Sequence, residues 1–142
     1  MKTSQVQAKW NGKIKEGKGV MKFTGYEGAY TFASRFENGT GTNPEELIGA
    51  AHAGCYSTYL SLLLTEEGLA PESIDTKAEV AIDQDDSGPY ITEIKLDCNV
   101  KCDGLDENKL KELARATKEK CPVSRLYAGG TAKISADAHL AK

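Results

Sequence analysis

The residues of this chain best suited to chemistry are its four cysteines, Cys55, Cys98, Cys102 and Cys121. A thiol becomes a nucleophile or a metal ligand when its surroundings favour the thiolate, and otherwise behaves as a small apolar core residue. In a reducing compartment, cysteines serve in metal binding, redox chemistry or packing more often than in a structural disulfide framework. The elements that carry the four thiols decide among these roles.

Cys98 and Cys102 lie in one predicted strand. Apolar residues alternate there through Ile94, Leu96, Cys98, Val100 and Cys102, a period of two that predicts a half-buried strand. Four residues of strand span roughly 13 Å, at ~3.3 Å per residue. Neither one zinc ion nor one disulfide bridges that separation, since zinc–sulfur bonds measure about 2.3 Å and bridged Cα atoms lie within about 7 Å. We therefore expect both thiols to pack in the core, and we predict no metal site and no cofactor.

Cys55 lies in the middle of the longest predicted helix. Asn43 is a suitable N-cap, Pro44 fits the first helical position, and Glu46 completes a capping box. The helix is expected to end at about Glu67, where the glycine that follows is a suitable terminator. Cys55 then stands about three turns inside an element with well-marked ends.

This helix carries no charge on any face from Leu47 to Leu64, and its first half is rich in glycine and alanine. A helix that is apolar all round must be buried all round, and a thin one lets another backbone approach closely. We expect a sheet on one side of it and a second helix on the other. Because a chain of 142 residues can hardly surround such a helix alone, the composition predicts a homodimer with this helix at the interface.

On the residues alone, Cys55 is either a buried core thiol or a nucleophile. A nucleophile needs a positive group, and Arg35 lies just upstream of the loop that leads to the helix. Glu45 could fix the guanidinium by hydrogen bonding, although a carboxylate in the first turn also complements the helix dipole. His52, one turn before Cys55, is interpreted as a packing or hydrogen-bonded residue, because no third group is placed to orient it as a base.

Cys121 ends an amphipathic helix predicted over 107–120 and directly precedes Pro122. If a short helix begins at Pro122, its backbone N–H groups would stabilise a Cys121 thiolate; otherwise Cys121 is a buried joint residue. Cys55 and Cys121 are 66 positions apart, so spacing says nothing about their distance in space. The residues alone therefore give two candidate thiols without a pairing.

The remaining elements are predicted to be strands. Alternating patterns give the order βββ-α-ββ-α-β, an α+β fold with antiparallel sheets, and the third strand is expected over 30–32, leading to Arg35. A chain of 142 residues has the size of one domain, predicted over 1–142. The net charge of −3 excludes the strongly basic character of nucleic-acid-binding domains. No signal peptide and no membrane span are predicted, which favours the cytoplasm.

Two motifs resemble a known family. The first comprises Arg35-Phe36-Glu37 and the run GTNPEELIGAAHAGC that ends at Cys55; the second is Cys121-Pro122-Val123-Ser124. Together they resemble the OsmC/Ohr family, and the first is closer to the OsmC branch (osmotically inducible protein C). The resemblance covers essentially the whole chain, and two motifs in the right order make it specific. Gly54 departs from the family pattern, where alanine is expected; glycine weakens a helix by roughly 0.5–1 kcal/mol but removes no chemical group.

The resemblance implies an OsmC-like fold, in which sheets wrap around a central buried helix in an intertwined homodimer. Cys55 would be the peroxidatic thiolate and Cys121 the resolving cysteine, with Arg35 and Glu45 as the activating pair. The protein would reduce organic hydroperoxides to alcohols through a Cys55 sulfenic acid and a Cys55–Cys121 disulfide, in oxidative or osmotic stress defence. Its reductant would be a dithiol, expected on a lipoylated protein.

Two alternative functions are considered besides the peroxidase. One is a different thiol chemistry, such as disulfide reduction or detoxification of electrophiles. The other is a non-catalytic dimer that binds a small apolar ligand in its cleft. Oxidation by a hydroperoxide distinguishes the peroxidase from both.

Overall fold

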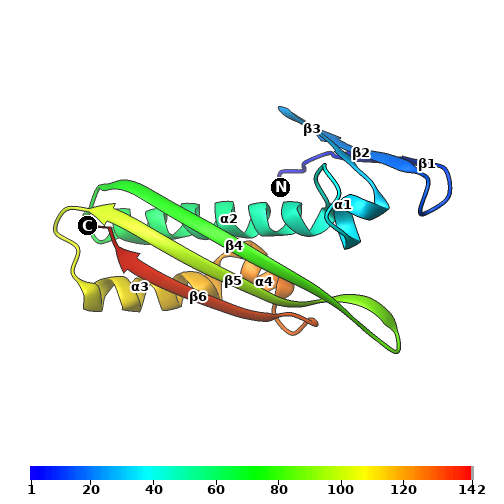
Figure 1. The fold of residues 1–142 in the computed structure, drawn as a ribbon. Coiled ribbons are helices and arrows are strands. Elements are labelled where there is room, and N and C mark those ends of the chain that lie inside the picture. Colours follow the sequence, from blue (N-terminus) through cyan, green and yellow to red (C-terminus); the bar gives the residue numbers. More distant parts are fainter. Residues whose placement is uncertain (142) are drawn as a thin grey trace. The chain divides into compact units, whose positions relative to one another are not determined.

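A computed structural model of the chain describes residues 1–141. The chain divides into two compact units, Met1–Leu47 and Ile48–Lys142. The elements, labelled in Figure 1, are β1 (Gln7–Asn11), β2 (Lys18–Phe23), β3 (Tyr26–Tyr30), α1 (Phe32–Phe36), α2 (Pro44–Glu66), β4 (Pro71–Asp85), β5 (Gly88–Cys102), α3 (Glu107–Lys120), α4 (Pro122–Tyr127) and β6 (Lys133–Leu140). The predicted α+β class is confirmed.

The first unit holds an antiparallel sheet of order β1-β2-β3, followed by the short helix α1. The strand predicted over 30–32 is correct only at Tyr30, where β3 ends, and wrong at Thr31 and Phe32. Thr31 then caps α1: its Oγ1 accepts from the Ser34 N–H at 3.1 Å, and the Ser34 Oγ accepts from the Thr31 N–H at 2.8 Å. This reciprocal capping box turns the chain into a helix. Arg35 therefore lies on α1 and not beyond a strand.

Helix α2 has the predicted limits to within one residue. At its start, the Asn43 Oδ1 accepts from the Glu46 N–H at 2.7 Å, as an N-cap does. At its end, Gly68 takes a φ of +80° and the Leu69 N–H donates to the Leu64 carbonyl at 3.0 Å. The left-handed glycine and the backward bond satisfy carbonyls that the helix would otherwise leave unpaired.

The second unit has two layers, a three-stranded sheet of order β4-β5-β6 and helices on one face of it (Figure 1). Alternate residues of β5 are buried, as its sequence pattern predicts. They share one apolar core with side chains of α2 and α3; its fully buried members include Tyr56, Leu60, Leu64, Ile94, Val100 and Leu110. Where α2 crosses the sheet, Gly49 allows close approach, since a Cβ there would lie 3.0 Å from the Val80 Cγ2.

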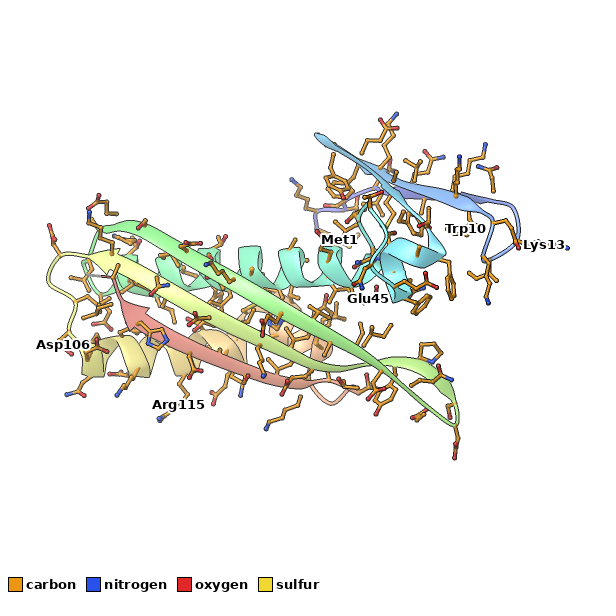
Figure 2. All side chains as sticks on the ribbon, viewed as in Figure 1. Met1, Trp10, Lys13, Glu45, Asp106 and Arg115 are labelled. Atoms are coloured by element: carbon orange, nitrogen blue, oxygen red, sulfur yellow. The ribbon has the colours of Figure 1, made fainter. Side chains whose placement is uncertain are left out.

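Helix α3 matches its predicted range, 107–120. Asp106 caps it by accepting from the Lys109 N–H at 2.8 Å, and Figure 2 shows Asp106 at this end of the helix. The predicted inward face, Leu110, Leu113, Ala114 and Thr117, is buried. Arg115, labelled in Figure 2, is exposed on the same helix. The short helix expected after Cys121 is also present, as α4.

One strand pairing differs from the prediction. Strands β4 and β5 form a long antiparallel hairpin, but β6 runs parallel to β5. The 30 residues between Cys102 and Lys133 contain α3 and α4, which return the chain to the end of the sheet where β5 began. A helical crossover of this length produces a parallel neighbour, whereas a tight turn would have produced an antiparallel one.

Helix α2 is long and apolar enough to pass a composition test for a membrane span. The core helix of a globular protein passes the same test, and α2 contributes three fully buried side chains to the core. Its opposite face is uncharged and exposed within the single chain, with Ala51, Gly54, Thr58 and Leu62 in one row. The side chain of Leu62 is 47% exposed.

Candidate active site

Two thiols from distant parts of the sequence meet in the second unit. Cys55 lies in the middle of α2, and Cys121 lies at the junction between α3 and α4. Their Sγ atoms are 2.9 Å apart, and both thiols are free. Cys121 is fully buried, whereas Cys55 is half-buried and therefore reachable from solvent. The residues alone left this pair unresolved, and the structure brings the two sulfurs to the distance at which a bond could form.

The backbone around Cys121 is fixed from both sides. Its N–H donates to the Thr117 carbonyl, and its carbonyl accepts from the Arg125 N–H, each at 2.9 Å. Pro122 occupies the first position of α4, where its missing N–H leaves no bond unmade. The N–H groups of Val123 and Ser124 follow in the first turn of α4, where a helix offers them no backbone acceptor.

Burial and hydrogen bonding shift the two thiol pKa values in opposite directions. Burial and the neighbouring Cys121 raise the pKa of Cys55. Burial also raises the pKa of Cys121, but the hydrogen bond with Cys55 and the polar groups at the start of α4 outweigh it and lower that pKa overall. Of the two thiols, Cys121 is therefore the one whose surroundings favour the thiolate more.

A second polar pair lies beside the thiols. The His52 Nε2 is 2.7 Å from the Ser124 Oγ, and both side chains are buried. His52 is thus hydrogen-bonded, as its sequence interpretation held. Ser124 was not singled out from the sequence by itself. Its only signal was its place three residues after Cys121, which puts it on the thiol face of α4.

Arg35 and Glu45 form an ion pair within the first unit. The Arg35 Nε and Nη2 donate to the Glu45 Oε1 at 3.0 and 2.8 Å, and the Arg35 guanidinium also lies over the Phe36 ring, 4.9 Å from its centroid. Figure 2 shows Glu45 at the start of α2. The Glu46 carboxylate instead accepts from the Thr42 hydroxyl at 3.4 Å, and Glu45 is the carboxylate that contacts Arg35.

The other two cysteines lie away from this pair. Cys98 is fully buried in the core of β5, and Cys102 is half-buried at the end of the same strand. Among residues 1–141, no three His, Cys, Asp or Glu side chains gather as metal ligands. Burial raises the pKa of both thiols, as expected for cysteines without an activating partner.

An apolar hollow of about 230 Å³ opens on the same side of the second unit as α4. It is lined by Ile48 of α2, Ile91 and Ile94 of β5, Leu126 and Tyr127 at the end of α4, and the segment 130–132 that follows. Ile48 lies one turn before His52 on α2, and Tyr127 packs edge-on against the His52 ring, 5.4 Å between centroids. The hollow is therefore adjacent to the polar pair that borders the thiols.

Two free thiols at near-bonding distance on an α+β scaffold place the chain among dithiol proteins. The chain belongs to the OsmC family: the family model described as OsmC-like protein matches residues 37–135. It is 46% identical over 123 residues to the peroxiredoxin OsmC of Escherichia coli, covering 84% of this chain and 86% of that protein. It is also 34% identical over 94 residues to the organic hydroperoxide resistance protein OhrB of Bacillus subtilis, covering 66% and 67%. The predicted family is confirmed.

Solved structures share the fold. An OsmC-like protein from Mycoplasma pneumoniae has a TM-score of 0.78 at 15% identity, covering 99% of both chains. The structure of Bacillus subtilis OhrB has a TM-score of 0.70 at 24% identity, covering 96% of this chain and 98% of that one. The predicted OsmC-like fold is thereby confirmed.

Proposed function

We propose that this protein is a cysteine-based peroxidase that reduces organic hydroperoxides to alcohols. The observation that carries the proposal is the 2.9 Å separation of the Cys55 and Cys121 sulfurs, one reachable from solvent and the other buried. The names of its relatives, peroxiredoxin and organic hydroperoxide resistance protein, support the same class of activity. A role in oxidative or osmotic stress defence follows from that activity.

In the proposed cycle, the Cys55 thiolate attacks one oxygen of the hydroperoxide and breaks the O–O bond. The alkoxide leaves and takes a proton to become the alcohol, and Cys55 is oxidised to a sulfenic acid. The Cys121 thiolate then attacks the Cys55 sulfur, an S–S bond forms, and the sulfenic oxygen leaves as hydroxide and is protonated to water. A dithiol reductant returns both cysteines to thiols and is itself oxidised to a disulfide.

The apolar hollow supports an organic substrate over hydrogen peroxide. Its lining of isoleucine, leucine and tyrosine side chains offers a hydrocarbon tail an environment that water does not. Ile48 stands seven residues before Cys55 on α2, about two helical turns or ~10 Å along the axis. An alkyl or aryl group of moderate length in the hollow would leave its peroxide end near Cys55.

One equivalent of cumene hydroperoxide tests the proposed function. After its addition, mass spectrometry should find a loss of two hydrogens per chain and one linked peptide pair containing Cys55 and Cys121. A linkage through Cys98 or Cys102 contradicts the assignment. A chain that stays fully reduced, while a control thiol peroxidase reacts, favours instead the non-catalytic binding of a small apolar ligand.

Arg35 is proposed to stabilise the Cys55 thiolate, with Glu45 fixing its guanidinium. Burial raises the pKa of the Cys55 thiol, so ionisation there needs positive charge. Arg35→Lys keeps the charge but loses the planar fork that donates twice to Glu45. We expect it to slow oxidation by cumene hydroperoxide at least about tenfold, because misplaced groups cost rates of this order. Stopped-flow oxidation over a range of pH measures both the rate and the apparent pKa of Cys55.

The matched control is Arg125→Lys, because Arg125 is an exposed cation on α4 that no role in the cycle requires. It should oxidise at the rate of the wild type. If Arg35→Lys does the same, Arg35 does not activate Cys55.

We further propose that the protein is a homodimer in which the exposed face of α2 is covered by the partner. That face carries no charge, and a Cβ added at Gly54 would meet nothing within 4 Å in the single chain. Gly54→Leu should therefore leave the fold of one chain intact but prevent close approach of a second helix. The expected result is a monomer by light scattering, with an unchanged far-ultraviolet spectrum.

Gly54→Ala is the control for this variant. Alanine is small enough to keep the contact and should stabilise the helix by about 0.5–1 kcal/mol. A monomeric wild type, or a Gly54→Leu protein that remains dimeric, would exclude this face as the interface.

The reductant is proposed to be a small dithiol, such as the dihydrolipoyl group of a lipoylated protein, and the compartment the cytoplasm. Both follow from the proposed cycle, which needs a donor of two electrons and a reducing environment. Comparing dihydrolipoamide with glutathione as the reductant of the disulfide form tests the first.

A further inference from the structure

We propose that the buried hydrogen bond between His52 and Ser124 positions Cys121 for disulfide formation, by holding helix α4 against helix α2. Both are positioning residues, since neither forms or breaks a covalent bond. The inference rests on the proposed dithiol cycle and concerns its second step. In that step the Cys121 sulfur bonds to the Cys55 sulfur, and the sulfenic oxygen leaves as hydroxide and is protonated to water.

Helix α2 meets α4 and its cap at two pairs of side chains. The His52 Nε2 is 2.7 Å from the Ser124 Oγ, and the Sγ atoms of Cys55 and Cys121 are 2.9 Å apart. The two contact residues on each segment are three positions apart and therefore share one face. A movement of α4 along α2 would break both contacts together, so the polar pair and the sulfur pair depend on the same register.

Helix α4 has little else to hold it in place. It has six residues, and a helix this short is not stable by itself in water. In the segment 121–127, only Cys121 and Ser124 are buried, and the side chain of Leu126 is 76% exposed. Apolar burial therefore contributes little to the position of α4, and the contacts of its two buried side chains set that position.

His52 is fully buried and contacts α4 in two ways. Its Nε2 bonds with the Ser124 hydroxyl, and Tyr127 packs edge-on against its ring. Burial lowers the pKa of His52, so the ring is neutral at physiological pH. A serine hydroxyl can donate or accept, so the bond forms whichever ring nitrogen carries the proton. Within residues 1–141 the Nδ1 has no hydrogen-bond partner, so losing Ser124 would leave the buried ring with none.

The position of α4 reaches the Cys121 sulfur through the backbone. The Cys121 carbonyl accepts from the Arg125 N–H of α4, whereas the Cys121 N–H donates to the Thr117 carbonyl of α3. Helix α3 is held by its own buried face, so only the bond to α4 depends on His52. A disulfide forms within a narrow range of geometry. If α4 is displaced, the two sulfurs spend less time in that range.

An equilibrium with glutathione measures this positioning without a hydroperoxide. Two protein thiols and one oxidised glutathione give the protein disulfide and two reduced glutathiones, and the equilibrium constant rises as the sulfurs are held together more firmly. We expect Ser124→Ala and His52→Leu each to lower this constant at least about tenfold, because small misplacements of reacting groups have effects of this size. Trapping with iodoacetamide followed by mass spectrometry gives the fraction of Cys55–Cys121 disulfide.

Two further variants separate positioning from a general loss of packing. His52→Gln keeps an N–H donor near the place of Nε2 and should stay within about threefold of the wild-type constant. Ser57→Ala removes a hydrogen bond of the same kind from the same helix, the 2.7 Å contact with Thr76 of β4, and should change the constant by less than about twofold. The proposal is wrong if Ser124→Ala matches the wild type, or if Ser57→Ala lowers the constant as much.

Cumene hydroperoxide shows which step the pair serves. In Ser124→Ala, the Cys55 sulfenic acid should form within about twofold of the wild-type rate, while disulfide closure slows at least about tenfold and dimedone traps more of the sulfenic acid. Equal slowing of both steps would contradict a positioning role. If the hydroperoxide does not react but the glutathione equilibrium responds as expected, the peroxidase proposal fails and the positioning of the disulfide stands.

Discussion

Cys55→Ser is expected to lose all peroxidase turnover. A serine hydroxyl is not ionised at neutral pH and cannot take up oxygen as a sulfenic acid, so the first step of the proposed cycle has no nucleophile. The rate of cumene hydroperoxide loss with dihydrolipoamide should fall to that of the buffer alone. The variant should still fold, because a serine at this half-buried position can accept from the Cys121 thiol as the Cys55 sulfur does.

Two further variants test whether the loss of turnover comes from the missing Cys55 thiol. Cys121→Ser should consume one equivalent of hydroperoxide per chain and then stall as a sulfenic acid, which dimedone would trap on Cys55. Cys102→Ser, at the end of β5, should keep full turnover. If Cys55→Ser retains activity, or Cys102→Ser loses it, Cys55 is not the nucleophile.

Leu60→Ala should strongly destabilise the fold. Leu60 is fully buried, on the face of α2 that meets the core shared by β5 and α3. Removing a buried leucine side chain costs about 2–5 kcal/mol, from lost burial and from the cavity that remains. The free energy of unfolding in urea, at one fixed protein concentration, should fall by that amount.

The matched control is Leu126→Ala, because the Leu126 side chain is 76% exposed. Its effect on the free energy of unfolding should stay within about 0.5 kcal/mol. Equal effects of the two substitutions would mean that Leu60 does not pack as described.

Local signals in the sequence predicted the long elements well. Asn43 and Pro44 marked the start of α2, Gly68 its end, and the apolar period the whole of α3. Each of these signals acts within a few residues, and for that reason the sequence alone predicts the element. The helix α1 had such a signal too, in Thr31 and Ser34, but the aromatic residues around them favoured a strand.

The sequence does not predict strand pairings and side-chain contacts between distant residues in the same way. Alternation identified β6 as a strand but not its parallel pairing with β5, because alternation is the same in either direction. Cys55 and Cys121 each had a plausible local setting, yet their 2.9 Å contact spans 66 residues of sequence. His52 and Ser124 are separated by 72 residues, and the sequence around neither residue predicts their contact.

The fixed backbone at Cys121 also affects how well the protein resists over-oxidation by hydroperoxide. Because its N–H and carbonyl are both bonded and its sulfur already lies beside Cys55, the disulfide can close by rotation of side chains, without local unfolding. A sulfenic acid on Cys55 should thus be short-lived and escape further oxidation to a sulfinic acid, which thiols do not reverse. In a large excess of hydroperoxide, the wild type should outlast Cys121→Ser, and mass spectrometry should find the Cys55 sulfinic acid in the variant alone.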